Sequence, residues 1–263
     1  MKNARSKVLF MIVGILVITP SLKAVDVTVK IESLVPENGV YFSPVWVAFH
    51  DGSFDLFDVG SLASEGIEHI AEDGDVSVLQ EDFAAVMGKA GVEGLITSPG
   101  GFEALPIFDP GESAMAEFTL AAGDNRYMSF ASMVVPSNDA FMGNHNPWAI
   151  ELFDAVGNFK GKQIITIPGS MVWDAGTELN TEMDAAFINQ TAPNTGVTTA
   201  SPVLPHPGYI GSHANPGGDP IILGGTNAAG KLIDPAGSDF TLPYAVVARI
   251  TIEAVEDAGP MHP

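Results

Sequence analysis

Cysteine is absent from this sequence of 263 residues, so no disulfide can stabilise the fold. Basic residues are scarce, because 11 Lys and Arg stand against 32 Asp and Glu, which gives a formal net charge of −21. A surface of this charge repels nucleic acid and anionic membranes, so we expect neither as a partner. It attracts divalent cations, although adaptation of the surface to salty water would by itself explain most of the charge.

Long hydrophobic runs are missing after the N-terminus. There, three basic residues precede an apolar run over Val8–Thr19, and Ala24 ends a short segment suited to cleavage. This pattern predicts a signal peptide over residues 1–24, the alternative being an uncleaved N-terminal anchor. We therefore expect a secreted protein, periplasmic or extracellular, without stable membrane insertion after cleavage and with a C-terminal tail over residues 255–263.

The motifs of common enzyme classes are also missing. The sequence has no Gly-x-Ser-x-Gly elbow, no His-Glu-x-x-His and no thiol nucleophile. Acid pairs such as Asp55 and Asp58 could serve glycoside hydrolysis, but acids are so abundant that such pairs arise by chance. We expect a protein that is not an enzyme, and the alternative is a secreted hydrolase that uses its acidic loops.

Short β-branched and aromatic runs, separated by many of the 28 Gly and 19 Pro, predict a mainly β fold. Loop-rich connections favour an antiparallel β-sandwich over a βαβ fold. Helical spacing is confined to Ala63–Glu72 and Val76–Met87, so we expect a small helical insertion at about 63–88. The strands are predicted at Val27–Leu34, Val45–Phe49, Glu117–Leu120, Tyr127–Val135, Trp148–Phe153, Gln163–Ile167 and Tyr244–Glu253.

Two segments carry acids in positions that suit a hard cation. In Phe130–Gly143 an apolar strand ends at a proline and Asp139 follows on a turn. In Trp173–Glu178, Asp174 and Glu178 stand four residues apart around a glycine. Carboxylates on short loops are typical ligands of calcium, so we predict a calcium-type site; a turn-forming aspartate that caps its own backbone is the alternative.

These segments resemble the N-terminal spondin domain of extracellular matrix proteins and of many bacterial secreted proteins. The resemblance covers roughly residues 25–254, and it is closest to the bacterial members. It implies a sandwich similar to a C2 domain, and a calcium ion bound through Asp139, Asp174 and Glu178, the last standing where animal members have Asp. Its four segments are Ser43–Phe54, Ala63–Gly74, Phe130–Gly143 and Trp173–Glu178.

Other candidate ligands are histidines. His206 and His213 lie on a Pro/Gly-rich loop and could bind copper or zinc, or serve as polar residues of a surface loop. His50 is expected to be a structural residue at a strand end. Taken with the resemblance, the sequence predicts a secreted calcium-binding module for extracellular binding or adhesion, with an extracellular protein or glycan as partner. A self-associating matrix protein is a further alternative.

Overall fold

The structure of the chain is a computed structural model that describes residues 24–98, 100, 106–193, 195–212, 219–227 and 230–256. Except for Ala24, the predicted signal peptide lies outside the described residues, as do His213 and most of the predicted tail. Within these ranges, no helix combines the length and the apolar composition that crossing a membrane requires.

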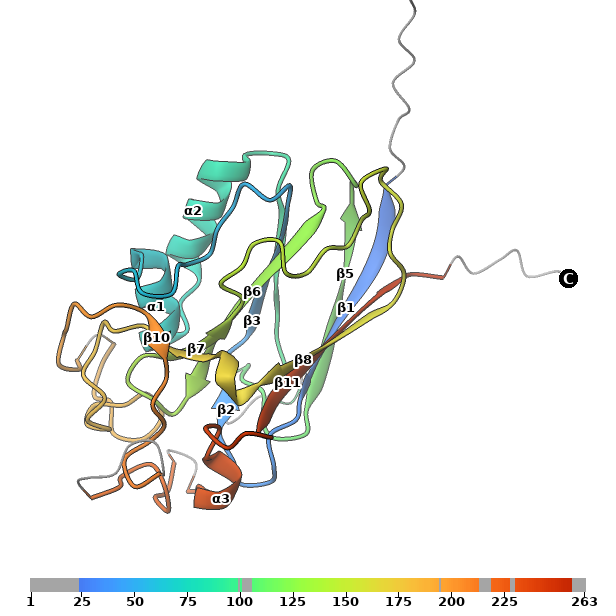
Figure 1. The fold of residues 1–263 in the computed structure, drawn as a ribbon. Coiled ribbons are helices and arrows are strands. Elements are labelled where there is room, and N and C mark those ends of the chain that lie inside the picture. The colour runs from blue at the N-terminus through green and yellow to red at the C-terminus, as the bar shows by residue number, and fades with distance from the viewer. Residues whose placement is uncertain are drawn as a thin grey trace, which may run out of the picture.

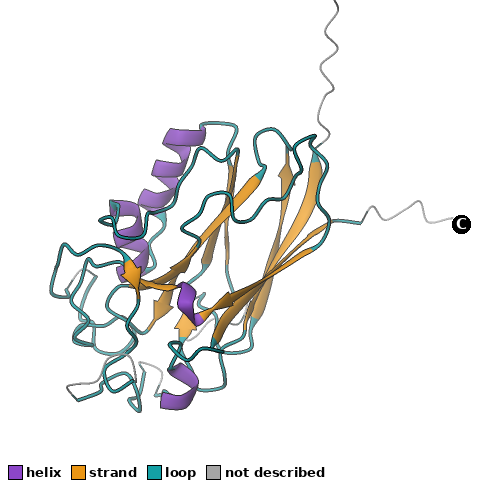
Figure 2. Ribbon diagram, viewed as in Figure 1, coloured by secondary structure: helices purple, strands orange, loops and turns teal. Residues whose placement is uncertain are grey.

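Two antiparallel sheets face each other and form a sandwich, so the predicted mainly β fold class is confirmed (Figure 1; Figure 2). The first sheet has the strand order β5-β1-β11-β8, with β1 (Val25–Ser33), β5 (Ser113–Leu120), β8 (Gln163–Pro168) and β11 (Val246–Ala254). The second has the order β10-β9-β7-β6-β3-β4, and β2 also pairs with β6. Its strands are β2 (Tyr41–Phe42), β3 (Val45–His50), β4 (Val92–Ile96), β6 (Tyr127–Val135), β7 (Ala140–Gly143), β9 (Val172–Asp174) and β10 (Leu204–Pro205).

Alternation of apolar and polar residues explains the first sheet. In β1, Val27, Val29 and Ile31 are fully buried between the sheets, whereas the residues between them face outward. Burying one such side chain stabilises the fold by about 1.5–3 kcal/mol. Val29 pairs with Ile252 of β11, and Ile31 pairs with Ile250, so both strands present one apolar face to the core.

The second sheet is covered on both faces, which explains why every residue of β3 is buried. Helices α1 (Glu65–Asp73) and α2 (Ser77–Met87) pack on its outer face, where Ile67 and Leu79 join Trp46 in one apolar cluster (Figure 1). The predicted helical insertion is therefore present. Gly74 ends α1 with φ +69°, a left-handed conformation that suits glycine at a helix C-terminus. Two short helices were not predicted: η1 (Gly169–Met171) and α3 (Pro235–Ser238).

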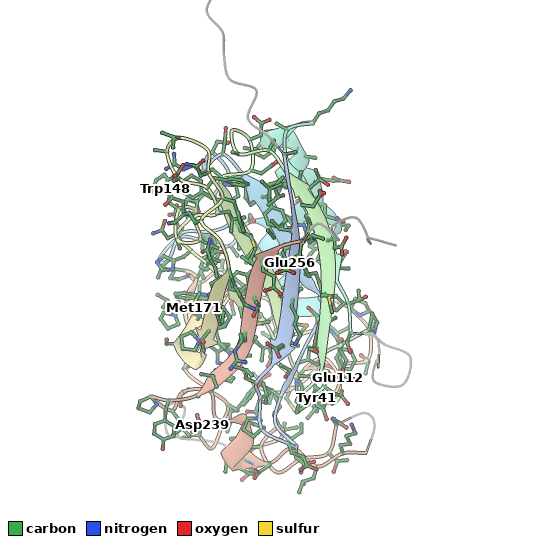
Figure 3. The ribbon with its side chains drawn as sticks, turned by 90° about the vertical axis from the view of Figure 1, so that its right-hand side faces the viewer. Tyr41, Glu112, Trp148, Met171, Asp239 and Glu256 are labelled. Carbon is green, nitrogen blue, oxygen red and sulfur yellow. The ribbon has the colours of Figure 1, made fainter. Side chains whose placement is uncertain are left out.

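The predicted strand at Trp148–Phe153 is wrong. Only isolated bridges occur there, such as Tyr127 with Glu151, and Trp148 is 61% exposed. The physical reason is a turn, because the Asn146 side chain accepts a hydrogen bond from the Trp148 N–H at 2.9 Å. Trp148 lies at one end of the sandwich and Asp239 at the other (Figure 3).

His50, at the end of β3, is a buried structural residue, as expected. Its Nδ1 accepts a hydrogen bond from the Gly52 N–H at 3.1 Å, so its Nε2 carries the proton and donates to the Ser129 hydroxyl at 3.0 Å. The ring is 0% exposed. Burial lowers the pKa of His50 to about 4, against the opposing charge of Asp51.

This lowered pKa predicts a loss of stability in acid. The unfolded chain takes up a proton near pH 6.5, whereas folded His50 does so only near 4. The contribution of neutral, buried His50 to the free energy of unfolding is therefore complete above pH 6.5. It declines as the pH falls towards 4, by at most about 3 kcal/mol. Urea unfolding of wild type and His50→Gln at several pH values should show a difference in unfolding free energy that changes in this window. A pH-independent difference would contradict the prediction.

Candidate metal site at the turn between β6 and β7

The turn after β6 places Asp139 at the end of the second sheet. The Ser137 hydroxyl donates to the Val134 carbonyl at 2.6 Å and accepts from the Ala140 N–H at 3.0 Å. These two bonds hold the chain in a tight turn between β6 and β7. Asp139 is thereby directed at the loop that follows β9, and its carbonyl accepts from the Ala175 N–H at 3.1 Å.

Asp139 is fully buried and only partly satisfied. Its Oδ2 accepts hydrogen bonds from the backbone N–H groups of Thr177 at 2.9 Å and Glu178 at 3.0 Å. Its Oδ1 is buried and has no hydrogen-bond partner among the described residues. Burial raises the pKa of Asp139 to about 7, and the charge of Asp174 acts in the same direction, against the two N–H donors.

Asp174 is the last residue of β9 and comes next to Asp139 through strand pairing. Its Cα lies opposite that of Ala140 in the β7–β9 ladder. Its Oδ1 accepts from the Gly176 N–H at 2.8 Å, and its Oδ2 accepts from the side-chain amide of Asn180. Burial raises the pKa of Asp174, although these hydrogen bonds favour the ionised form. The two carboxylates both resist ionisation and lie close enough for their charges to interact.

Gly176 allows the loop to make this approach. Its φ is +71°, and a Cβ at this position would lie 2.4 Å from the carbonyl oxygen of Ser201. The Gly176 carbonyl in turn accepts from the Ser201 N–H at 2.9 Å, so the two segments pack backbone to backbone.

Replacing Gly176 with Ala should therefore destabilise the protein by about 3 kcal/mol, from left-handed strain of about 1–2 kcal/mol and a backbone clash. Gly111→Ala is the matched control, since Gly111 has φ +82° but nothing within 4 Å of the added Cβ. Gly111→Ala should lose only the stability that corresponds to the left-handed strain. Thermal melts of both variants check this, and equal losses would contradict a close approach at Gly176.

Glu178 is also buried, but its carboxylate has other neighbours. Its Oε2 accepts from the Asn138 side-chain amide at 3.3 Å. Burial raises the pKa of Glu178, and the charges of Asp73 and Asp184 add to this rise. Glu72 of α1 is a further buried acid, which no sequence motif marks: it is 4% exposed, and burial raises its pKa to about 7.

The structure thus brings Asp139 close to Asp174 and to the backbone of Glu178, on elements distant in sequence. Even so, no three Asp, Glu, His or Cys side chains in the described part of the chain are placed to hold a metal ion together. Beside Asp174 and Glu178, but not lined by Asp139, lies a cavity of about 290 Å³. Its walls include Asp174, Glu178, Asn180, Thr199 and Ser201. The side-chain donors there are oxygen-rich, with no sulfur or imidazole, which suits calcium better than zinc or copper.

His206 is not a surface residue. It is 8% exposed, its Nδ1 accepts from the Gly208 N–H at 3.0 Å, and its ring packs against Tyr209 and Phe240. Burial lowers its pKa to about 3, so the ring is neutral. Asp55 and Asp58, the pair considered for hydrolysis, are both exposed.

Glu182 is a buried acid that the sequence analysis missed. Its carboxylate accepts three backbone hydrogen bonds, from Ile210 at 2.6 Å, Ile221 at 2.7 Å and Ile222 at 2.9 Å. Its own N–H donates to the Asn138 side chain at 2.9 Å. Glu182 therefore attaches the loop residues Ile210, Ile221 and Ile222 to the turn that carries Asp139. No sequence signal marks it, because its partners are backbone groups far along the chain.

The family model described as Spondin_N matches residues 33–207, which is more than half of the chain. The chain belongs to the spondin N-terminal domain family. The resemblance seen in the sequence is thus confirmed, and family membership indicates an extracellular module.

The part of this spondin domain that matches the family contains all three predicted ligands, both helices of the insertion and the β6–β7 turn. Most of β1 and all of β11 lie outside it, although Val27–Ser33 of β1 pairs with Ala248–Ala254 of β11 in the first sheet. A comparison with curated proteins found no match.

Proposed function

We propose that this spondin domain is a secreted calcium-binding β-sandwich that serves as a module for extracellular binding or adhesion. The observation that carries the proposal is the buried carboxylate of Asp139, whose Oδ1 has no partner among the described residues and whose neighbour is Asp174. Burying such a group without a counter-charge is costly. A divalent cation at this point would remove the cost.

Asp139, Asp174 and Glu178 would hold the ion. Calcium, when bound, supplies a double positive charge that favours the ionised form of each carboxylate. Asp139 keeps its Oδ2 hydrogen-bonded to the loop backbone and offers its Oδ1 to the ion. Asp174, at the end of β9, and Glu178, in the loop that follows, would supply the other two carboxylates. Glu178 must turn from Asn138 to take part, and neutral oxygens of the adjoining cavity would complete a shell of six to eight ligands.

The extracellular partner is proposed to be a protein or a glycan. The formal net charge of −21 argues against nucleic acid and anionic membranes as targets. It favours a neutral or basic partner, or one held through the calcium ion.

Calorimetric titration with calcium tests the metal site. Wild type should bind one calcium ion per chain, and Asp174→Asn should weaken binding at least tenfold, because a ligand charge is lost. Asp124→Asn, in the exposed turn before β6, is the matched control and should bind as wild type does. Failure of wild type to bind calcium, or an equal effect of both substitutions, would refute the proposed site.

Binding of the protein to arrays of extracellular proteins and glycans, with calcium and with chelator, tests its proposed role as a binding module. Capture that depends on calcium supports the proposed role. Release of cleaved glycan would favour the secreted hydrolase, and open-ended self-association in sedimentation experiments would favour the matrix protein.

A further inference from the structure

The strand β8 (Gln163–Pro168) is one edge of the first sheet, and β5 is the other (Figure 3). Its strand partner in the described part of the chain is β11 alone. Residues Ile164–Ile167 make no further backbone hydrogen bond to a described residue. Every second residue of an edge strand directs its N–H and C=O groups away from the sheet. The edge of β8 therefore presents a row of backbone donors and acceptors that suits pairing with another extended chain.

The other edges of the two sheets carry features that hinder such pairing. In the first sheet, β5 contains Glu117; in the second, β4 contains Glu93, and β10 is two residues long and includes Pro205. Charge, proline and short length are the usual means by which edge strands avoid pairing with other chains. In β8 the segment Gln163–Ile167 is uncharged, and four of its residues are β-branched. Its edge is therefore the least protected of the four.

The sequence of β8 matches a second copy of itself. Two such strands can pair antiparallel around a two-fold axis, and the register that pairs all of Gln163–Ile167 sets Ile165 opposite Ile165 of the second copy. Ile164 then lies opposite Thr166 of the second copy. Opposite side chains share a face of the sheet, so Ile165 stays on the core side, where it is already partly buried, and Ile164 stays on the outer side. No charge meets a like charge along the strand.

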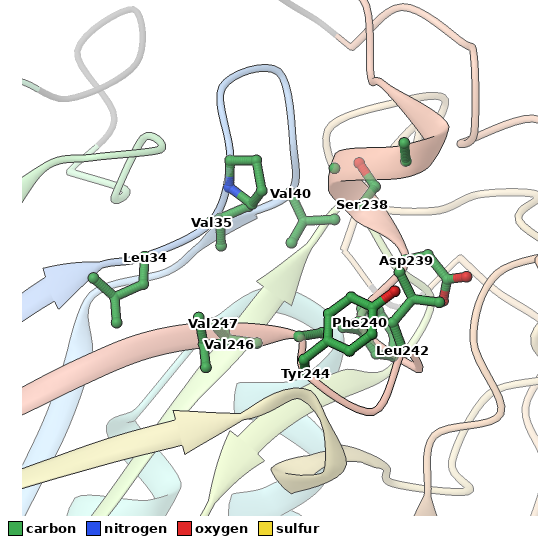
Figure 4. A pocket seen from close by; sticks show the side chains of 14 residues that line it. Leu34, Val35, Val40, Ser238, Asp239, Phe240, Leu242, Tyr244, Val246 and Val247 are labelled. Atoms are coloured by element: carbon green, nitrogen blue, oxygen red, sulfur yellow. The ribbon is translucent and has the colours of Figure 1, made fainter.

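The two ends of β8 also complement each other. Lys162 stands directly before the strand, and its side chain is 56% exposed although its amine pairs with an acid of β11. At the other end, the Gly169 N–H donates to the Ala245 carbonyl at 2.9 Å, which brings the start of β11 beside the end of β8. Asp239 and Tyr244 lie on this segment, and Tyr244 is 80% exposed (Figure 4). Antiparallel pairing brings the lysine end of one copy towards the acid and the aromatic ring of the other.

We propose that two copies of the chain pair along β8 and join their four-stranded first sheets into one continuous antiparallel sheet. The two-fold axis uses both β8 edges, so association stops at two copies, unlike the open assembly of a matrix protein. The proposed calcium ligands lie outside β8, so the pairing does not depend on calcium. The net charge of −21 on each copy opposes the pairing, and salt screens this repulsion. We therefore expect a weak dimer that salt strengthens.

Sedimentation velocity tests the proposal at about 0.1 M and 1 M sodium chloride, where the Debye length is about 10 Å and 3 Å. Wild type should be mainly dimeric at about 100 μM protein in the higher salt, and its dissociation constant should be at least tenfold larger in the lower salt. Ile164→Lys should weaken the dimer at least tenfold, because it places a charge beside the new strand. Met115→Lys is the matched control: Met115 is 66% exposed on β5, Ile164 is 61% exposed on β8, and both face outward. It should dimerise as wild type does.

The absence of cysteine allows a second test, of the register. Opposite residues of an antiparallel pair have Cα atoms about 4.5–5.5 Å apart, which is within the range of a disulfide. Under mild oxidation with diamide, Ile165→Cys should form a disulfide-linked dimer. Ala116→Cys, partly buried on the core side of the β5 edge, should not. Thermal melts verify that every variant is folded.

Several results would overturn the proposal. A wild type that remains monomeric at about 1 mM in both salts would show that the β8 edge does not pair with itself. An unchanged dimer in folded Ile164→Lys, or an equal loss in Met115→Lys, would place the contact elsewhere. Equal cross-linking of Ile165→Cys and Ala116→Cys would exclude the register. Growth beyond two copies would contradict a closed pair and favour the matrix protein.

Discussion

Replacing Asp139 with Asn is expected to stabilise the calcium-free protein and to remove its stabilisation by calcium. Without metal, the folded state carries a carboxylate whose pKa is raised to about 7 from 3.8. The sign follows from this rise: the penalty is absent below pH 3.8, grows as the pH increases and is complete above 7. At pH 8 the substitution removes a penalty of about 2–4 kcal/mol. The Asn oxygen can still accept from the backbone N–H groups of Thr177 and Glu178.

In calcium, wild type should instead be more stable than Asp139→Asn. An ion that binds only the folded state stabilises wild type by about 2.7 kcal/mol at a hundred times its dissociation constant. Asp139→Asn, which lacks the charge, should gain little. Thermal melts at pH 8 in calcium and in chelator measure both effects, with Asp124→Asn as the control that should follow wild type. A wild type that melts at one temperature in both conditions would show that no calcium site exists.

Replacing Glu182 with Ala should be the most damaging single change among the acids. Three backbone N–H groups would lose their acceptor, and that of Ile222 lies in a fully buried residue. Hydrogen bonds to a charged group contribute about 1.5–3 kcal/mol each, and some of the loss is recovered where water enters. We expect a loss of about 3–5 kcal/mol in the free energy of unfolding. Faster amide exchange at Ile210, Ile221 and Ile222 should accompany it.

The control for Glu182 is Glu81→Ala. Glu81 is exposed on α2, so its replacement should change stability by no more than about 0.5 kcal/mol. Urea unfolding of the two variants provides the comparison. If Glu182→Ala unfolds at the same urea concentration as wild type, the carboxylate does not anchor the backbone at Ile210, Ile221 and Ile222.

Local sequence was sufficient to predict a secondary-structure element where the element is long and its residue pattern is regular. The strand predicted at Tyr127–Val135 agrees with β6 residue for residue, since a largely apolar run without Gly or Pro ends at Pro136. The short strands β4 and β7 were missed, because each contains a glycine and neither shows alternation. In β4 that glycine is required by packing, as a Cβ on Gly94 would lie 2.7 Å from the Phe118 ring. Such a contact between distant strands leaves no mark in the neighbouring residues.

The candidate site also has features that the local sequence predicted and features that it could not. The proline, the turn and Asp139 are adjacent in sequence, and so are Asp174, Gly176 and Glu178, which allowed both loops to be selected. Their meeting depends on the pairing of β7 with β9, which the sequence analysis did not predict. The direction of the Glu178 side chain towards Asn138 depends on packing alone.

By itself, the sequence determined that the fold is mainly β, that it contains no disulfide and that its charge is strongly negative, because composition and short-range pattern suffice for these properties. Only the tertiary structure decided which of the 32 acids are buried, that Glu182 anchors a loop, and that β8 is an edge strand of its sheet. The physical reason is that desolvation and hydrogen bonding act through space. The free-energy cost of burying a carboxylate or hydroxyl depends on the atoms around it, and these come from segments far apart in the chain.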